Sequence, residues 1–135
     1  MAEMSKEVQD LFNNPEASKV LATVDTAGNL NVVPKGTVSA VGADTIAFAE
    51  LVGGKTKANL ESVNKAAVTV FKMSMPPSGY QVKGTFQGFQ TSGPLFDKFA
   101  SMVKQMLKID IQSVGTIKVE EVYSVSPADA GKKLS

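Results

Sequence analysis

The chain contains no cysteine, no histidine, no tryptophan and no arginine, and all 14 of its basic residues are lysines. Without cysteine it forms no disulfide, no thiolate zinc site and no thiol nucleophile. Without histidine it builds neither a Ser-His-Asp triad nor a histidine-ligated metal site. Without arginine it has no bidentate guanidinium clamp for a carboxylate or a phosphate. The sequence therefore indicates no catalytic residue and no metal site, and any chemistry is expected to come from a bound cofactor.

Length and charge narrow the class of protein further. The 135 residues, of which 43% are apolar, suffice for a single domain over residues 1–135 with its own core. The net charge is +1, and the lysines are interspersed with acidic residues rather than gathered in the basic stripe of a nucleic-acid binder. No apolar run reaches the roughly 18 residues that cross a bilayer, and the polar first residues do not resemble a signal peptide. We expect a cytoplasmic protein that binds neither nucleic acid nor membranes.

The hydrophobic pattern predicts a mainly β protein. Apolar residues at helical spacing predict helices over residues 4–12, 57–64 and 94–107. Alternating and β-branched segments between glycine and proline turns predict strands over residues 20–25, 30–33, 36–41, 45–50, 67–72, 80–90 and 114–125. Because these strands follow one another mostly in hairpins, the pattern predicts an antiparallel barrel with flanking helices.

Several local features refine this prediction. Pro34 cannot donate to a strand ladder, so its strand is expected to end there or to lie at a sheet edge. Gly84 and Gly88 interrupt the strand over residues 80–90, which indicates a bend or a close approach of another backbone or a ligand. The Met-rich apolar face of the helix over residues 94–107 is typical of core. The polar tail over residues 127–135 is expected to be frayed.

One segment has the composition of a phosphate-binding turn. Residues 49–56 (AELVGGKT) match the P-loop pattern except that Ala49 replaces the first glycine. Backbone N–H groups after the two glycines, a helix N-terminus, Lys55 and Lys57 would attract an anion, and Thr56 can cap the helix or donate to a phosphate oxygen. Three interpretations are open: an ordinary glycine turn with solvated lysines, a P-loop nucleotide site, or another phosphate site for a small cofactor. The hairpins elsewhere disfavour a P-loop, which requires parallel βαβ units.

At these residues the sequence resembles the FMN-binding split barrels of the pyridoxamine 5'-phosphate oxidase-like superfamily. It is most similar to the small stand-alone FMN-binding members. The resemblance rests on an ordered set of segments: AFAE at residues 47–50, GGKTKANLE at 53–61, AVTVF at 67–71 and GYQVKGTF at 79–86. Together with residues 20–36, these segments span most of the chain.

The resemblance implies a split-barrel homodimer with two FMN sites at its interface. The positions that match the family's cofactor contacts fall into four groups. They are Lys55, Thr56 and Lys57 for the phosphate, then Val33, Pro34, Lys35 and Gly36 beside the ribityl chain and ring, then Ala49 and Glu50 at the isoalloxazine edge, and Gln87 on a strand from the partner subunit.

Some of these residues also have ordinary interpretations. Val33 and Pro34 fit a plain strand end, and Lys35 fits a solvated lysine. Glu50 fits a surface carboxylate, since a negative charge near a reduced flavin is unfavourable.

The absence of arginine and histidine departs from the family's pattern. Family oxidases commonly bind phosphate and substrate with arginine, and true pyridoxamine phosphate oxidases use arginine and histidine for the substrate. We therefore expect an FMN-binding flavoprotein that acts in electron transfer or as an FMN-dependent oxidoreductase, and not a true pyridoxamine phosphate oxidase. The sequence does not indicate its redox partner. Two alternatives stand beside this expectation: a cofactor-free binding module on the same barrel, and nucleotide-phosphate binding through Gly54, Lys55 and Thr56.

Overall fold

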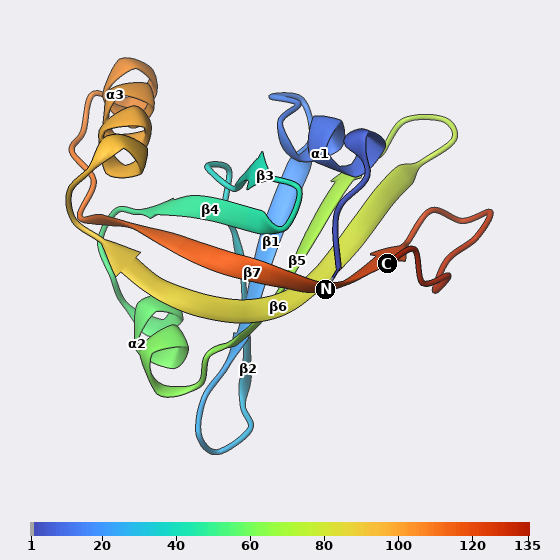
Figure 1. Cartoon of the computed structure of the whole chain (residues 1–135), viewed down its shortest axis with the longest axis horizontal. Helices are drawn as coiled ribbons and strands as arrows, with labels where there is room; N and C mark the ends of the chain where they lie inside the picture. Colours follow the sequence, from blue (N-terminus) through green and yellow to red (C-terminus); the bar gives the residue numbers. More distant parts are fainter. Residues whose placement is uncertain (1) are drawn as a thin grey trace.

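Seven strands form one curved antiparallel sheet in the computed structural model of the chain, which describes residues 2–135 (Figure 1). They are β1 (Ser18–Val24), β2 (Leu30–Pro34), β3 (Ser39–Gly42), β4 (Thr45–Glu50), β5 (Lys65–Lys72), β6 (Ser78–Gln90) and β7 (Ser113–Ser124). Their order in the sheet is β2-β1-β5-β6-β7-β4-β3. The long strands β6 and β7 bend across the whole molecule, so the sheet wraps into a split barrel with β2 and β3 at its edges. The predicted fold class is confirmed.

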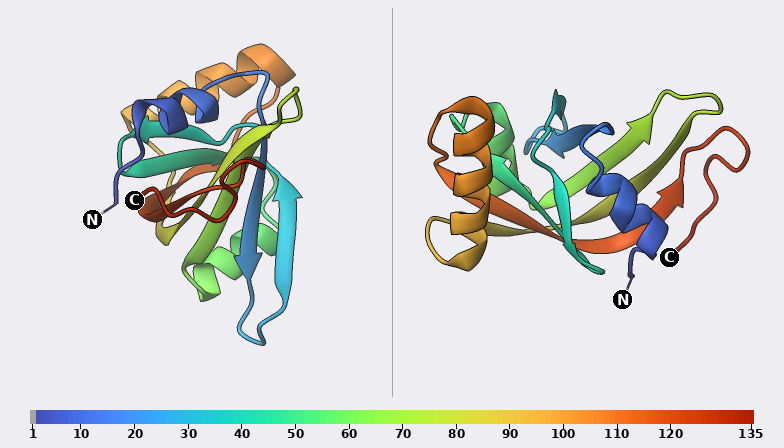
Figure 2. Two further views of the ribbon diagram at one scale, coloured as in Figure 1. Left: turned by 90° about the vertical axis from the view of Figure 1, so that its right-hand side faces the viewer. Right: turned by 90° about the horizontal axis from the view of Figure 1, so that it is seen from above.

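Three helices flank this sheet in the described part of the chain: α1 (Lys6–Phe12), α2 (Lys55–Ser62) and α3 (Pro94–Leu107). Ser5 caps α1 by accepting a hydrogen bond from the Val8 backbone N–H, and α1 covers β3 and β5. α2 contacts β1 and β2, and α3 packs on β4 and β7 (Figure 2). None of these helices is long and apolar enough to cross a membrane.

Side-chain alternation along β4 separates two apolar clusters. Ile46 and Phe48 face the barrel interior and join its large core. Ala47 and Ala49 face outward and pack against α3 through Phe99 and Val103. Burying one such large apolar side chain contributes about 1.5–3 kcal/mol. The core prediction for the α3 face is therefore confirmed at its middle, while Met106 and Leu107 at its end are 71% and 53% exposed.

The connection between β2 and β3 differs from the prediction. A strand was expected from residue 36, but β3 begins at Ser39. Residues 35–38 form a turn in which the Val38 N–H donates to the Lys35 carbonyl over 3.2 Å. As predicted, β2 ends at Pro34 and is an edge strand.

The tail was predicted to be frayed, and this is wrong. The Leu134 N–H donates to the Val122 carbonyl over 2.7 Å, and the Gly131 N–H donates to the Ser124 carbonyl over 2.8 Å. Both partners lie beyond the residues of β7 that pair with β4. The tail therefore forms hydrogen bonds with backbone groups at the end of β7, where the shorter strand β4 does not reach. Composition alone does not reveal this pairing.

Candidate functional site

Two glycines bring the chain from β4 into α2. Gly53 and Gly54 have φ angles of 77° and 94°, in the region that favours glycine. Because the chain turns on these residues, α2 begins at Lys55 rather than at the predicted residue 57, with Gly54 as its N-cap. Gly54 provides no side-chain hydrogen bond to the first turn, and that turn carries no acidic residue. N–H groups of a helix's first turn lack partners within the helix, so this end of α2 is suited to an anion.

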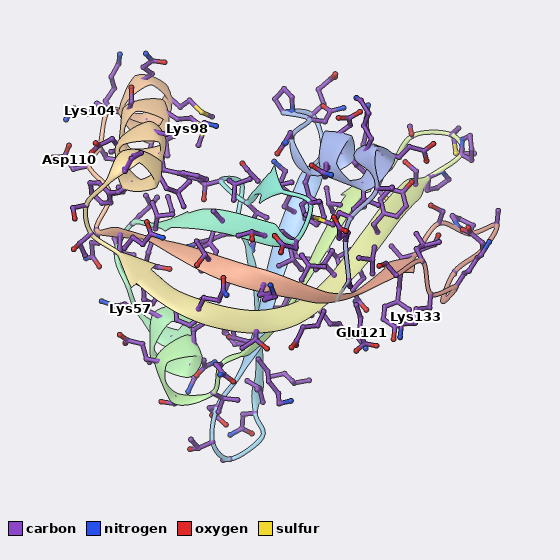
Figure 3. The ribbon with its side chains drawn as sticks, in the orientation of Figure 1. Lys57, Lys98, Lys104, Asp110, Glu121 and Lys133 are labelled. Atoms are coloured by element: carbon purple, nitrogen blue, oxygen red, sulfur yellow. The ribbon has the colours of Figure 1, made fainter. Side chains whose placement is uncertain are left out.

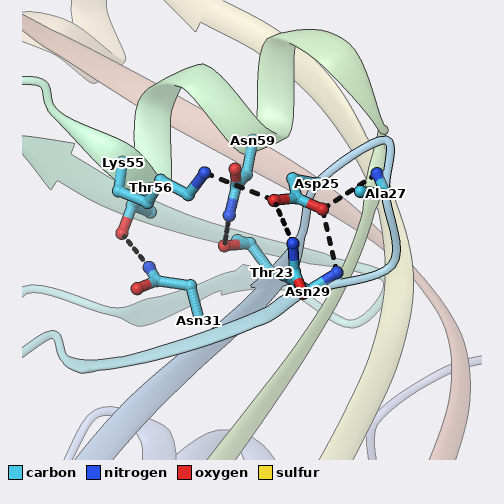
Figure 4. A network of polar contacts seen from close by, with 8 residues as sticks. All are labelled: Thr23, Asp25, Ala27, Asn29, Asn31, Lys55, Thr56 and Asn59. Carbon is cyan, nitrogen blue, oxygen red and sulfur yellow. Dashed lines mark hydrogen bonds and ion pairs between the residues drawn. The ribbon is translucent and has the colours of Figure 1, made fainter.

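Lys55 and Thr56 contact the β1–β2 hairpin (Figure 4). Lys55 Nζ lies 3.4 Å from Asp25 Oδ2, and the Lys55 side chain is 60% exposed. Thr56 is buried, and its Oγ1 accepts a hydrogen bond of 3.1 Å from Asn31 Nδ2 on β2. Thr56 therefore lies inside the first turn and is not the N-cap, and its hydroxyl retains a hydrogen to donate.

Polar side chains of the hairpin hold α2 in place. Asp25 accepts hydrogen bonds from the backbone N–H groups of Ala27 and Asn29, at 2.9 and 2.8 Å, and from Asn29 Nδ2 at 3.2 Å. The Asn29 backbone N–H is the largest of the effects that lower the pKa of Asp25 below its ordinary value of 3.8. Next to it, Asn59 of α2 donates a buried hydrogen bond of 3.1 Å to Thr23 of β1. These contacts fix the position of the turn relative to the sheet.

A buried ion pair lies where β2 and β4 end. Lys35 Nζ is 3.2 Å from Glu50 Oε2, and the two side chains are 14% and 3% exposed. Lys35 Nζ also lies 5.6 Å from the centre of the Phe48 ring. The interpretations of Lys35 as a solvated lysine and of Glu50 as a surface carboxylate are therefore wrong. Residues 15 positions apart meet here because the chain crosses from β2 to β3 and returns along β4.

Two aromatic rings connect this ion pair with the glycine turn. The rings of Phe48 and Phe89 pack edge to face with their centres 6.2 Å apart. Lys57 Nζ lies 5.7 Å from the centre of the Phe89 ring, and the side chain of Lys57 projects from α2 (Figure 3). Lys35 therefore lies over the Phe48 ring and Lys57 over the Phe89 ring, and these two rings pack against each other.

The other residues predicted for the site are more scattered. Val33 packs partly buried against the core, and Pro34 and Gly36 are exposed. The Ala49 side chain is fully buried beneath α3, on the face of β4 opposite to Glu50. Gln87 is exposed on β6 and makes no side-chain hydrogen bond within residues 2–135. The structure brings Lys35 and Glu50 together but does not bring the side chain of Ala49 to them.

Sequence reasoning missed Thr23, Asp25, Asn31 and Asn59. A weak signal existed for Asp25, which opens a turn ending in Gly28 and Asn29. The others became recognisable only once α2 was placed against the hairpin.

The donor set fits a phosphate-bearing cofactor. An uncapped helix N-terminus, two ammonium groups and a threonine hydroxyl match the acceptors of a phosphate. Ser113, paired across the sheet with Glu50, has a buried hydroxyl without a hydrogen-bond partner in the described chain. No group of three histidine, cysteine, aspartate or glutamate side chains able to hold a metal ion occurs among residues 2–135.

Comparison with known proteins identifies the family. Residues 4–128 match the family described as pyridoxamine 5'-phosphate oxidase. The chain belongs to this family. No curated protein matches the chain.

Solved structures with the family's split-barrel fold resemble the chain over most of its length. HupZ of Group A Streptococcus is 25% identical, with a TM-score of 0.80, over 96% of this chain and 99% of that one. An FMN-binding protein from Syntrophomonas wolfei is 22% identical, with a TM-score of 0.82, over 90% of this chain and 85% of that one. HutZ, a heme storage protein from Vibrio cholerae, is 12% identical, with a TM-score of 0.62, over 90% of this chain and 94% of that one. The last two likenesses concern the fold alone.

Proposed function

We propose that the chain binds FMN and serves in electron transfer or as an FMN-dependent oxidoreductase. The observation that carries this proposal is the turn at Gly53 and Gly54, which leads into the uncapped N-terminus of α2 with Lys55, Thr56 and Lys57 beside it. The family match supports a flavin as the ligand.

The chain's own residues would bind and orient the cofactor. Lys55 and Lys57 would neutralise phosphate charge as point charges, while the Thr56 hydroxyl and the first-turn N–H groups donate hydrogen bonds. The hydrogen bond from Asn31 holds the Thr56 oxygen in place. The bound flavin would supply the redox chemistry, since this chain has no cysteine thiol that could cycle with a disulfide.

Two other ligands fit the chain less well. A P-loop nucleotide site needs parallel strands, whereas each strand pair within residues 2–135 is antiparallel. Haem is most often held by histidine or cysteine, and the chain contains neither.

Titration with FMN and with riboflavin tests the proposal, because riboflavin lacks the phosphate. We expect FMN fluorescence to be quenched saturably by the wild-type protein. Lys55→Ala should weaken FMN binding about tenfold, the effect of losing one charge-assisted hydrogen bond, and should leave riboflavin binding unchanged. Lys104→Ala is the matched control, because Lys104 is also an exposed lysine paired with one aspartate, at 59% exposure.

The outcomes separate the candidate functions. A protein that does not quench FMN saturably is not a flavin binder, and the cofactor-free binding module then replaces the proposal. If Lys55→Ala weakened the binding of FMN and of riboflavin equally, the phosphate of FMN would not bind at Lys55. Binding of a nucleotide that requires Mg²⁺ and is lost in Lys55→Ala would favour the nucleotide alternative.

We also propose that the chain forms a homodimer through the outer face of β1, β2 and β5. On this face the register aligns Val32, Ala22 and Ala67 across the three strands. Val32 is 61% exposed and Leu30 is 80% exposed. A groove of about 290 Å³ includes Ala22, Leu30 and Ala67 of this face in its lining, together with lysines and glutamates: Lys65, Lys83, Glu120 and Glu121. A surface with an apolar centre and both signs of charge can complement a second copy of itself about a twofold axis.

A further inference from the structure

The Lys35–Glu50 ion pair is not explained by stability. Glu50 is 2% exposed, so the pair lies largely out of water. The free energy of removing two charges from water is about as large as that gained from their attraction. Apolar side chains of similar volume therefore often stabilise a fold equally well. We therefore look for a role of this ion pair other than stabilising the fold.

The surroundings of the pair lead to the glycine turn. The Glu50 carbonyl accepts a hydrogen bond of 2.8 Å from the Gln112 N–H. The side chain of Gln112 in turn lies beside Gly53, because a Cβ atom added to this glycine would be 3.5 Å from the Gln112 side-chain oxygen. On the other side, Lys35 contacts Phe48, and the Phe89 ring links Phe48 to Lys57.

A second polar group lies at the same place without a partner. Ser113 faces Glu50 across the β4–β7 pairing, so both side chains project from the same face of the sheet. The Ser113 hydroxyl is buried and makes no hydrogen bond within the described chain. Buried hydroxyl groups are nearly always satisfied, so this one indicates a position where a ligand or water completes the site.

We propose that Glu50 is a positioning residue that holds the Lys35 ammonium beside the flavin ring, and that this pair sets the relative affinity of the protein for oxidised and reduced flavin. The inference rests on the proposed FMN site. Reduction adds two electrons and one proton to the ring, which thereby gains one negative charge. A nearby cation favours the reduced ring and a nearby carboxylate disfavours it, so the paired groups offset one another.

Variants that each remove one charge test this inference. Glu50→Gln leaves the Lys35 charge uncompensated and should favour binding of reduced over oxidised FMN about tenfold, the effect of one unit charge at a partly shielded site. That ratio raises the two-electron reduction potential by about 30 mV. Lys35→Met should shift the potential by a similar amount in the opposite direction, and the double variant should return close to wild type. The potentials are measured by titration with dithionite against a reference dye.

Matched controls separate this effect from a structural one. Lys118 and Asp44 form an ion pair of 3.4 Å at the other end of β4, so Lys118→Met and Asp44→Asn should leave the potential unchanged. The opposite shifts should also appear with riboflavin, because the charges act on the ring and not on the phosphate. Circular dichroism of each variant checks that the sheet is intact.

The results distinguish this inference from the proposed function. Shifts of opposite sign in the two single variants support it. Unchanged potentials, shifts of the same sign, or complete loss of FMN in either single variant overturn it while leaving FMN binding by the wild type established. Failure of the wild-type protein to bind FMN overturns both proposals.

Discussion

The side-chain amide of Asn31 donates a hydrogen bond of 3.1 Å to Thr56 Oγ1, and this contact ties the edge strand β2 to the first turn of α2 (Figure 4). Two residues 25 positions apart thereby fix the orientation of the candidate phosphate site. The contact also holds the threonine oxygen so that its hydrogen is directed away from Asn31.

Loss of this contact should lower the stability of the fold. We expect Asn31→Ala to reduce the free energy of unfolding by about 1 kcal/mol, because the buried Thr56 hydroxyl loses its donor. Urea unfolding measures the change. Gln105→Ala serves as the control, since Gln105 is exposed on α3 and makes no side-chain hydrogen bond within residues 2–135. Equal effects of the two substitutions would show that the Asn31 contact contributes nothing specific.

Gly84 is required by a close approach between β6 and β7. A Cβ atom at this position would lie 2.1 Å from the Lys118 carbonyl oxygen, which belongs to the backbone and cannot move aside. We expect Gly84→Ala to destabilise the protein by more than about 2 kcal/mol, or to prevent folding, because the two long strands must separate. Gly42→Ala is the matched control, since a Cβ atom there meets nothing within 4 Å. A melting temperature of Gly84→Ala equal to that of Gly42→Ala would contradict the close approach.

The Asp25 carboxylate should make stability depend on pH in the acid range. Its hydrogen bonds, that from the Asn29 backbone N–H first, lower its pKa in the folded protein below 3.8. A carboxyl group with a lowered pKa stabilises the fold above its unfolded pKa, and this contribution is lost as the pH falls through the folded value. We therefore expect wild type to be more stable than Asp25→Asn at neutral pH, with the difference narrowing below about pH 4. Urea unfolding at several pH values measures this difference in the free energy of unfolding. A difference that stays constant or widens in acid would show that the Asp25 charge does not contribute to stability.

Light scattering at micromolar concentration tests the proposed dimer. We expect the wild-type protein to have twice the mass of the chain, and Val32→Glu to have the mass of one chain, because it buries a charge at the centre of the proposed interface. Val41→Glu is the control, since Val41 is a partly exposed valine on the other edge strand, β3. A wild-type monomer would overturn the homodimer, and a dimeric Val32→Glu would place the interface on another surface.

Local patterns sufficed for much of the fold. The pattern between turn residues predicted a strand over residues 45–50, and β4 has the bounds that were predicted for it. Pro34 ended its strand at a sheet edge because a proline has no N–H to donate. The glycine turn before α2 was also recognisable, although the exact start of the helix was not.

Other features depended on contacts between distant segments. The tail was expected to fray, yet it binds backbone groups of β7 that only the short length of β4 leaves open. The resemblance placed Glu50 at the flavin edge and its ordinary interpretation was a surface carboxylate, but neither included an ion pair with Lys35. A sequence does not show that Lys35 returns to the same end of the barrel.

The sequence by itself determined that this protein has no cysteine, histidine or arginine with which to perform chemistry, and that its strands form hairpins around one lysine-rich glycine turn. Composition and residue spacing suffice for these points, because they are properties of the chain alone. Only the tertiary structure decided that Lys35 and Glu50 form a buried pair and that Asn31 supports Thr56. Burial and pairing are set by how the sheet curves and which strands become neighbours, and those relationships exist only when the whole barrel has formed.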